Sequence, residues 1–521
     1  MNSTYTGLSR IIERNAQTFG HSPAIICEHE TRTWQQTQDR IASAAAGLGR
    51  MGVQKNDKIA LLGLNSDCYF EFLYIPAWLG AICVPLNIRW SLSENMYALE
   101  DSDATVLVFD DAFIEIAGAL KDKCPHIKNF IHIGQKECPE WAVPYIKLWS
   151  EFEAIPSTPT GGEDVAYIMY TGGTTGLPKG VMQSHNGFFV SSMSIAMDLK
   201  LESTDIFMHA APMFHVADCG VGMAATIVGA AQTFVPSFTP AAVLNTIQNS
   251  NVTFTILVPT MIKMMIEHTD FHQADLSSLK KLIYGASPMQ ESVALKTIEG
   301  LPHTKLYQAY GQTELSPIAT VSMPSDHEIG NPRMRSAGRA TFCTNVRIRL
   351  ENGQLAHVGQ VGEVEVSGPN VMLGYLNKPE ITQETLIDGY VKTGDAGYLD
   401  EGGYLFLVDR VKDMIITGGE NVFSSEVESI LSLHPAVNDV VVIGIPNEQW
   451  GEQVHAIVIL SPDQKVDEKE LQEFCKEKIA GYKCPKSIEY RTEAFPLSSA
   501  GKVLKVTIRE PYWKNHEKMV N

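Results

Sequence analysis

The 521-residue chain is predicted to be an α/β protein: a large N-terminal domain of layered βαβ sheets, a small β-rich subdomain and a small α+β C-terminal domain. The first observation behind this is the alternation of short apolar runs with longer amphipathic runs between about 165 and 309. Such alternation predicts βαβ units and a mostly parallel sheet. The second is the length, which exceeds what one hydrophobic core normally serves.

The individual elements follow from this alternation. Strand-like runs occur at 165–170, 205–210, 231–235, 252–257, 279–284 and 304–309. Helix-like runs lie between them, near 186–198, 216–229, 240–249, 259–268 and 288–299. An earlier α/β segment is expected over 22–150. Its most apolar run, 72–86, contains prolines and is too short to cross a bilayer, so we expect a buried helix followed by a strand.

The pattern changes in the last third of the chain. Short β-rich runs with glycine turns fill 340–408. After 412 the pattern predicts helices near 424–432 and 468–480, with strands near 438–444 and 453–460. We therefore divide the chain into a domain at 1–411 and a smaller one at 412–521.

The composition of the chain excludes some classes of binding partner. A net charge of −19 argues against nucleic acid and anionic membrane as main partners. The first residues carry no signal-peptide pattern, and we expect no transmembrane segment. The nine cysteines have neither CxxC nor zinc-site spacing, which is typical of reduced thiols in a cytoplasmic protein. The oligomeric state stays open, with a homo-oligomer among the options.

A loop at 171–180 carries the strongest chemical signal. It combines four glycines, three threonines and one lysine directly after an apolar strand. Glycines let a backbone approach phosphate closely, while amide, hydroxyl and ammonium groups donate to phosphate oxygens. The loop is not a Walker P-loop, because Leu177 and Pro178 separate Gly176 from Lys179. The predicted polyphosphate contacts are Thr171, Gly172, Gly173, Thr174, Thr175, Gly176 and Lys179.

Three other polar segments follow predicted strands, at 211–215, 285–287 and 310–314. In a parallel sheet such loops open at one edge, where ligands of α/β proteins bind. We therefore expect all four segments to meet in one active site. If the strands were antiparallel instead, the four segments would lie at opposite edges of the sheet and would not form one site.

The motifs together resemble those of the acyl-adenylate-forming superfamily, which includes acyl-CoA synthetases, aryl-CoA ligases, beetle luciferases and peptide-synthetase adenylation domains. The signature loop 170–180 is followed, in the family's order, by motifs at 310–314, 393–395, 409–413, 418–422 and 499–505. Two positions depart from the family pattern: Gly172 replaces the usual Ser, and Ser424 replaces the usual Pro.

The resemblance implies a role for each motif residue. The loop threonines and Lys179 would hold the β- and γ-phosphates of ATP, Thr313 would contact the α-phosphate, and Glu314 would help to hold Mg²⁺. Asp395 and Arg410 would bind the ribose, and Lys502 would bridge the α-phosphate and the acid. The remaining nucleotide contacts would be Gly285, Ala286, Ser287, Tyr310, Gly311 and Gln312. Out of context, Asp395 would be a turn residue and Lys502 a solvated lysine.

The resemblance also implies a mobile C-terminal domain that turns about Lys412 between two half-reactions. In one orientation Lys502 reaches the nucleotide. In the other, Gly418, Gly419 and Glu420 line a path for the pantetheine arm of CoA. His215 is either a structural histidine or a catalytic gate near the acyl carboxylate.

The identity of the acid is the weakest inference. Expected pocket walls are His215–Met223, Phe234–Phe238 and Gly311, which are mostly apolar. Blocks at 336–340, 414–422 and 509–513 look most like bacterial fatty-acyl-CoA synthetases, so a medium- or long-chain fatty acid is favoured. Benzoate- or coumarate-type acids are the alternative. Asp218, if it reached the pocket, would favour a polar or amine-bearing acid.

Other readings of the sequence stay open. An adenylating enzyme with a different acceptor shares these motifs, as does a luciferase-type oxygenase. A peptide-synthetase module would normally continue into a carrier domain, whereas this chain ends about 19 residues after Lys502. A nucleotide sensor without turnover would need neither Lys502 nor a hinge.

Overall fold

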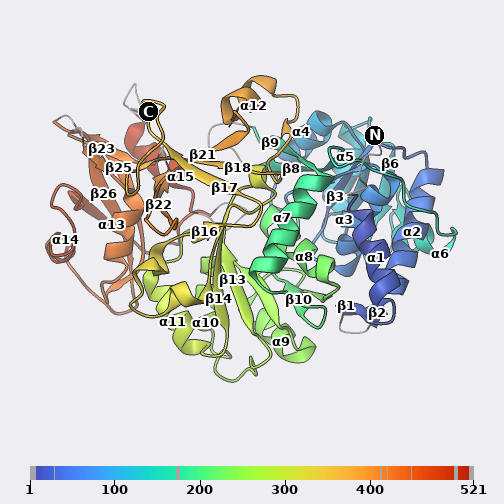
Figure 1. Cartoon of the computed structure of the whole chain (residues 1–521), viewed down its shortest axis with the longest axis horizontal. Coiled ribbons are helices and arrows are strands. Elements are labelled where there is room, and N and C mark those ends of the chain that lie inside the picture. Colours follow the sequence, from blue (N-terminus) through green and yellow to red (C-terminus); the bar gives the residue numbers. More distant parts are fainter. Residues whose placement is uncertain are drawn as a thin grey trace.

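The computed structural model describes residues 7–27, 30–171, 177–410, 413–418, 420–447, 449–497 and 503–514. Within these ranges the strands form four sheets. Two large sheets build the N-terminal part, a third forms a β-rich subdomain, and the fourth belongs to the C-terminal unit, drawn in orange to red in Figure 1. The predicted α/β class, with a β-rich subdomain and a small α+β unit, is confirmed.

The first large sheet carries most of the strands predicted between 205 and 309. Its inner strands are parallel, and at one edge β15 runs antiparallel to both β14 and β16. In spatial order its strands are β16 (Arg339–Ala340), β15 (Thr320–Ser322), β14 (Lys305–Tyr310), β13 (Lys281–Gly285), β12 (Phe254–Leu257), β10 (Ile206–His209), β11 (Ala231–Phe234), β1 (Pro23–Cys27) and β2 (Glu30–Thr33).

The second large sheet is built mainly from the first half of the chain. Its central strands are parallel, whereas β9 runs antiparallel to both β8 and β19. In spatial order its strands are β19 (Gly374–Tyr375), β9 (Lys179–Ser184), β8 (Val165–Thr171), β4 (Ile82–Pro85), β3 (Lys58–Leu62), β5 (Ala104–Phe109), β6 (Asn129–His132) and β7 (Val143–Pro144).

The expectation of one sheet for 165–309 is therefore wrong. β8 lies in the second sheet, while the later strands lie in the first. The 22–150 segment is also divided, because β1 pairs in parallel with β11 of the first sheet. The alternation reports each βα unit but carries no information on which sheet a strand joins.

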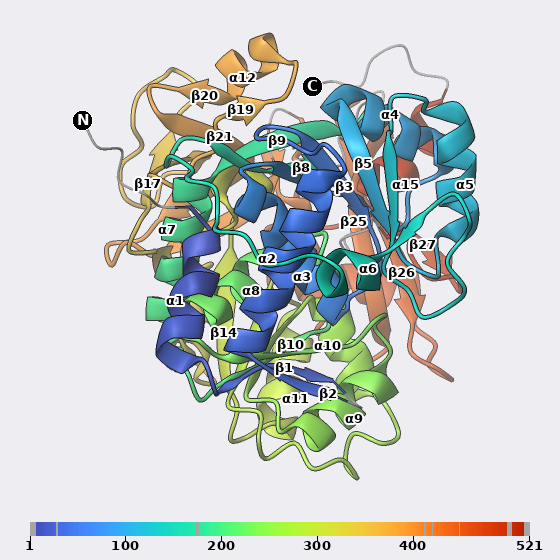
Figure 2. The same cartoon turned by 90° about the vertical axis from the view of Figure 1, so that its right-hand side faces the viewer.

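Helices whose buried apolar side chains pack in one cluster fill the space between the two large sheets (Figure 2). They are α1 (Ser9–Phe19), α2 (Trp34–Arg50), α3 (Asp67–Leu79), α7 (His185–Asp198) and α8 (Val216–Val228). The predicted buried helix and strand within 72–86 correspond to α3 and β4, so that prediction is confirmed. Within the described ranges no helix is both long and apolar enough to cross a bilayer.

Helices also cover the outer faces of both sheets. On the first sheet these are α9 (Pro240–Ser250), α10 (Pro259–Ile266) and α11 (Glu291–Gly300); on the second they are α4 (Leu92–Ser102) and α5 (Ile114–Lys123), with α6 (Tyr145–Ser150) following β7. Local chemistry sets the ends of α9. Thr239 accepts a hydrogen bond from the Ala242 amide, Pro240 begins the helix, and Asn251 ends it in the left-handed conformation.

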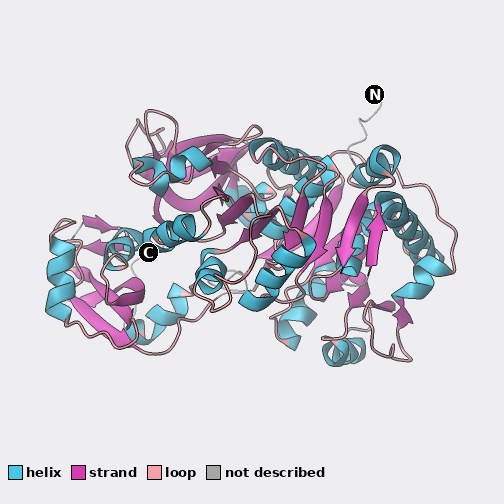
Figure 3. Ribbon diagram, turned by 90° about the horizontal axis from the view of Figure 1, so that it is seen from below, coloured by secondary structure: helices cyan, strands magenta, loops and turns pink. Residues whose placement is uncertain are grey.

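The β-rich subdomain and the C-terminal unit complete the chain (Figure 3). The subdomain contains β17 (Asn345–Arg349), β18 (Gly362–Ser367), β20 (Leu386–Ile387), β21 (Tyr390–Leu399) and β22 (Leu405–Arg410), with α12 (Pro379–Thr385) beside it. The C-terminal unit contains β23 (Ile415–Thr417), β24 (Glu420–Val422), β25 (Val437–Asn447), β26 (Gly451–Leu460), β27 (Ser487–Arg491), α13 (Ser424–Leu431), α14 (Glu468–Lys476) and α15 (Lys505–Trp513).

Candidate active site

A large cleft runs between the N-terminal sheets and the C-terminal unit. Its volume of about 2370 Å³ exceeds the range usual for one small-molecule pocket. Side chains of all four predicted polar segments lie on its walls, including Lys179, His215, Ser287 and Glu314. Three of these segments follow β10, β13 and β14 of the first sheet, and the fourth follows β8 of the second. Packing of two sheets, rather than one parallel edge, therefore brings the segments together.

The phosphate-type loop joins two antiparallel strands. Thr171 and Lys179 are register partners at the ends of β8 and β9, and the Thr171 hydroxyl donates to the Lys179 carbonyl at 3.4 Å. A Walker P-loop instead connects a strand to a helix, so the hairpin agrees with the residue spacing, which already excluded that motif. The predicted contacts Gly172, Gly173, Thr174, Thr175 and Gly176 lie outside the described residues.

Tyr375 connects Lys179 to Glu314 across the cleft. The Lys179 ammonium lies 4.3 Å from the centre of the Tyr375 ring, a cation–π contact. The Tyr375 hydroxyl donates to Glu314 Oε1 at 2.7 Å. Burial raises the pKa of Tyr375, and the Glu314 carboxylate raises it further, so the hydroxyl remains a donor. Sequence reasoning missed Tyr375, because no motif links it to a residue 61 positions away.

Glu314 lies in a short 3₁₀ turn, Thr313–Leu315, which follows β14. Gln183 of β9 donates to the Thr313 carbonyl at 2.7 Å, and this bond ties the turn to the second sheet. Gly311, just before the turn, has no room for a side chain, because a Cβ there would lie 1.9 Å from the Pro317 carbonyl oxygen. The glycine therefore allows the segment to fold back on itself beside the predicted phosphate contacts.

The predicted ribose-binding group Asp395 is buried, with 7% of its surface exposed. Its Oδ2 atom accepts hydrogen bonds from the Tyr310 hydroxyl at 2.7 Å and from Gln312 Nε2 at 2.9 Å. Gln312 also donates to the Thr393 carbonyl at 2.7 Å. Arg410 is the register partner of Asp395 on the neighbouring strand β22, but its side chain lies outside the described set. The structure thus joins two motifs that lie about 80 residues apart.

Gly285, Ala286 and Ser287 follow β13 and lie on the cleft wall. Ala286 adopts a positive φ of 64°, which is uncommon for a residue with a side chain. The turn lies beside the end of β14, since Gly285 pairs with Ala309. These positions are those expected for the nucleotide face of the site.

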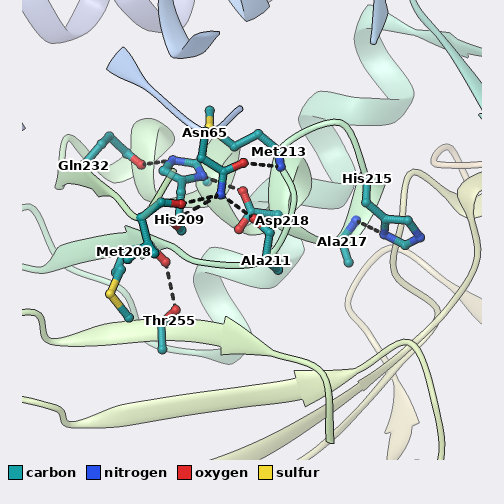
Figure 4. Close-up of polar contacts among 12 residues, drawn as sticks. Asn65, Met208, His209, Ala211, Met213, His215, Ala217, Asp218, Gln232 and Thr255 are labelled. Carbon is teal, nitrogen blue, oxygen red and sulfur yellow. Dashed lines mark hydrogen bonds and ion pairs between the residues drawn. The ribbon is translucent and has the colours of Figure 1, made fainter. Parts of the chain in front are cut away.

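His215 caps the N-terminus of α8 and also lies on the cleft wall. Its Nδ1 atom accepts a hydrogen bond from the Ala217 amide at 3.3 Å. Figure 4 shows the ring apart from the polar cluster on the other side of the loop. The structural role has direct support in this cap, while the gating role stays a prediction.

A buried asparagine holds the loop that leads to His215 (Figure 4). The Asn65 amide donates to the carbonyls of Ala211 at 2.9 Å and Val235 at 3.1 Å, and Asn65 Oδ1 accepts from the Met213 amide at 2.8 Å. Asn65 follows β3 of the second sheet, so these bonds join the two sheets behind the site. Sequence reasoning gave no signal for this residue.

Asp218 does not reach the acyl pocket. It is fully buried, and its Oδ2 atom lies 2.5 Å from Nδ1 of His209, whose Nε2 atom lies 3.0 Å from Gln232 Oε1 (Figure 4). Burial raises the pKa of Asp218, while the neighbouring His209 acts in the opposite direction. Asp218 therefore forms a structural pair with His209 inside the core. Because it does not reach the pocket, it gives no reason to expect a polar or amine-bearing acid.

The predicted pocket walls are correct only in part. His215, Val216, Ala217 and Val221 of the 215–223 segment line the cleft, as does Gly311, but Phe234–Phe238 does not. Phe234 instead stacks on the His209 ring, with centroids 5.1 Å apart. Helix α7 and strands β12–β14 supply the rest of the apolar wall.

The C-terminal unit meets the cleft through its last segment and its hinge side. Val503 lines the cleft, whereas Lys412, Gly419 and Lys502 lie outside the described residues. Gly418 has a positive φ and packs closely against Trp450, and Glu420 begins β24. The domain boundary at 411/412 and the hinge stay predictions.

Ser424 ties the hinge strand to the C-terminal unit. Its amide and its hydroxyl both donate to Asp409 Oδ2, at 2.6 and 2.7 Å. A proline at this position would provide neither donor. The departure from the family pattern therefore adds two hydrogen bonds beside the predicted hinge.

Comparisons with known proteins identify the family of the chain. The family model "AMP-binding enzyme" matches residues 12–376, and "AMP-binding enzyme C-terminal domain" matches 426–502. A feruloyl-CoA synthase from Amycolatopsis sp is 35% identical over 508 residues, covering 97% of this chain and 99% of that protein. The fatty acid–[acyl-carrier-protein] ligase ScoC from Streptomyces coeruleorubidus is 32% identical over 516 residues, covering 97% and 96%.

Solved structures show the same architecture. The anthranilate CoA ligase AuaEII, in complex with anthranoyl-AMP, aligns with a TM-score of 0.90 at 25% identity, covering 98% of this chain and 97% of that one. The resemblance inferred from the motifs is thereby confirmed. The chain belongs to the AMP-binding enzyme family, within the adenylate-forming superfamily of acyl-CoA ligases.

Proposed function

We propose that this enzyme is an ATP-dependent acyl-CoA synthetase that works in two steps. The carboxylate of the acid attacks the α-phosphate of ATP, which releases pyrophosphate and forms an acyl adenylate. The thiol of CoA then attacks the acyl carbon, which forms the thioester and releases AMP. The observation that carries this proposal is the single cleft on which Lys179, Glu314 and Asp395 lie.

The proposed roles follow from the charges and donors on the cleft walls. Thr171 and Lys179 would hold the terminal phosphates, and Thr313 the α-phosphate. Asp395, which Tyr310 and Gln312 hold in place through Oδ2, would accept hydrogen bonds from the ribose hydroxyls. Lys502 would place a cation where negative charge develops, a role that can contribute about 3–4 kcal/mol to catalysis.

Glu314 fits a magnesium ligand. One carboxylate oxygen accepts from Tyr375, which orients the group, and the other oxygen has no hydrogen bond among the described residues. No cluster of three or more acidic, histidine or cysteine side chains in the described parts could hold a metal alone. Mg²⁺ commonly binds through one or two carboxylates together with substrate phosphates. Bound there, it would neutralise phosphate charge.

The acid should be hydrophobic, because the inner wall of the cleft is apolar. The relatives named above act on ferulate and on fatty acids, so both classes remain candidates. The motif blocks favour a medium- or long-chain fatty acid, and an aryl or cinnamate-type acid is the second candidate. The acceptor is proposed to be CoA, reached along Gly418, Gly419 and Glu420; a carrier protein is the alternative, as in the name of ScoC.

Between the two steps, the C-terminal unit would turn about Lys412. Before the turn, Lys502 would face the nucleotide; after it, the CoA-binding segment would face the nucleotide instead. We also propose a cytoplasmic location, in keeping with nine free cysteines.

The test is acid-dependent exchange of labelled pyrophosphate into ATP over a panel of aliphatic and aromatic acids. Exchange should require both an acid and Mg²⁺, and Lys502→Met should abolish it. Adding CoA should then yield AMP and a thioester. A nucleotide sensor would show no exchange, and a luciferase-type enzyme would consume oxygen or emit light with a luciferin; either result would overturn the proposal.

A further inference from the structure

The inner part of the cleft is a narrow apolar pocket between the first sheet and two helices. Its floor is formed by neighbouring residues of three parallel strands, since Ile256 pairs with Ile283 and Ile283 pairs with Tyr307. The opposite wall comes from α7 and α8. The residues that line this pocket and pack in one hydrophobic cluster are Ile195, Leu199, Val221, Ile256, Ile283, Tyr307 and Ile318.

Tyr307 carries the one polar side-chain group in this set. Its side chain is 4% exposed and lies on the cavity wall, and in the described part of the chain its hydroxyl has no hydrogen-bond partner. Other buried tyrosines are satisfied: Tyr74 donates to Thr226 at 2.9 Å and Tyr167 to the Leu73 carbonyl at 3.0 Å.

The hydroxyls of Tyr69 and Tyr97 are fully enclosed and lack a partner among the described residues, but neither side chain lines the cleft. Tyr307 is therefore distinguished by an unpaired donor on the wall of the substrate cavity. Burial raises the pKa of Tyr307, so the hydroxyl keeps its proton at neutral pH. The hydroxyl faces the cleft, so a ligand that fills the cavity takes away its access to water. A donor left without a partner in this way is unfavourable, and a ligand atom that accepts its hydrogen bond avoids that penalty.

The position of Tyr307 sets the length of such a ligand. Tyr307 precedes Tyr310 by three residues on β14, so it lies roughly 10 Å further along the strand than the nucleotide end of the site. Gly220 lets α8 approach the Pro317 ring closely, because a Cβ at position 220 would lie 2.6 Å from that ring. Pro317 lines the cleft, so a flat group suits this space better than a bulky one.

We propose that the Tyr307 hydroxyl selects acids that carry an oxygen substituent at the end opposite the carboxylate, namely hydroxy- or methoxy-substituted aryl acids. The inference rests on the proposed synthetase function, and it selects the aryl class, the second of the two candidate acids, over the fatty acid that the motif blocks favour. A plain hydrocarbon chain fills the same apolar walls but leaves the hydroxyl unpaired. Sites that hydrogen-bond a substrate oxygen discriminate strongly against analogues that lack it.

The experiment compares matched acids in the pyrophosphate-exchange assay with the full-length enzyme. The pairs are cinnamate with 4-hydroxycinnamate, and octanoate with 8-hydroxyoctanoate as the aliphatic counterpart. Wild-type enzyme should prefer 4-hydroxycinnamate over cinnamate by about tenfold or more in kcat/KM. Tyr307→Phe should remove that preference by lowering the value for 4-hydroxycinnamate about tenfold while leaving cinnamate unchanged or improved.

Tyr74→Phe is the matched control, because it removes a buried tyrosine hydroxyl that donates to Thr226 outside the cavity. This variant should keep the wild-type preference even where its melting temperature falls. The wild-type ratio tests the inference without any variant. Equal rates for the paired aryl acids, octanoate as the best acid, or an unchanged preference in Tyr307→Phe would each refute the inference and leave the synthetase function intact. Absence of exchange with every acid would refute both.

Discussion

Replacing Tyr375 by phenylalanine separates the two contacts that this side chain makes at the proposed phosphate end of the cleft. The ring that lies 4.3 Å from the Lys179 ammonium is retained, whereas the hydroxyl that donates to Glu314 at 2.7 Å is lost. A hydrogen bond to a charged group contributes about 1.5–3 kcal/mol, equivalent to about 10- to 100-fold in rate if it acts in the transition state.

We therefore expect Tyr375→Phe to lower kcat/KM for ATP by about 10- to 100-fold and to raise the Mg²⁺ concentration needed for half-maximal exchange. The physical reason is that Glu314 loses the donor that orients its carboxylate toward the metal and phosphates. The assay is pyrophosphate exchange, titrated separately with ATP and with Mg²⁺.

Tyr145→Phe is the matched control for this change. Tyr145 also donates to a carboxylate, Glu71 Oε2 at 2.6 Å, but it does not line the cleft. Both variants should lose some stability against urea, and only Tyr375→Phe should change the Mg²⁺ titration. If Tyr375→Phe keeps wild-type values for ATP and Mg²⁺, the reasoning about Glu314 is wrong.

Three further changes test other parts of the molecule. Asp395→Asn should raise KM for ATP about tenfold, because an amide replaces the charged acceptor of the ribose site; an unchanged KM in steady-state exchange would exclude that role. Lys412→Pro, at a position outside the described residues, should spare adenylate formation and strongly slow thioester formation, and equal loss in both half-reactions would argue against a hinge. Burial lowers the pKa of His185 from 6.5 to about 4, so its contribution to stability is complete above pH 6.5 and falls by about 3 kcal/mol as the pH drops to 4. His185→Asn, which still offers an acceptor to the Leu8 amide, should flatten this part of the pH dependence in urea unfolding; a wild-type slope would contradict the assignment.

Local sequence patterns predicted the elements better than their assembly. Apolar periodicity located helices such as α7 and α8 and strands such as β13 and β14 to within a few residues, because each has its own buried face. It could not predict that β1 pairs with β11, since Ile25 and Gln232 become neighbours only through packing over about 200 residues. For the same reason β8 was placed in the wrong sheet.

In the candidate site, too, residues of local motifs could be expected from the sequence, whereas residues that matter through their packing could not. The resemblance of their motifs led us to expect Lys179, Glu314 and Asp395 in one site, and all three line the cleft, while their roles stay predictions. Tyr375 and Asn65 could not be expected, because each acts through an ordinary polar group whose importance depends on what packs beside it. Asp218 is the converse case: its charge suggested a pocket residue, while folding paired it with His209 in the core.

The contacts between the C-terminal unit and the rest bear on the proposed turning. Away from the proposed hinge, the described hydrogen bonds between the two parts are few: Lys263 donates to the Asn438 carbonyl at 2.8 Å, and Gln290 donates to Asp439 at 3.2 Å. The Lys263 bond is exposed, and exposed polar contacts contribute little to stability. The pair of bonds from Ser424 to Asp409 is stronger, because a carboxylate accepts both, and it lies beside the proposed pivot. A rotation that separates Asp409 from α13 would therefore meet its main resistance at the hinge itself, where this chain has a serine in place of the proline usual in the family.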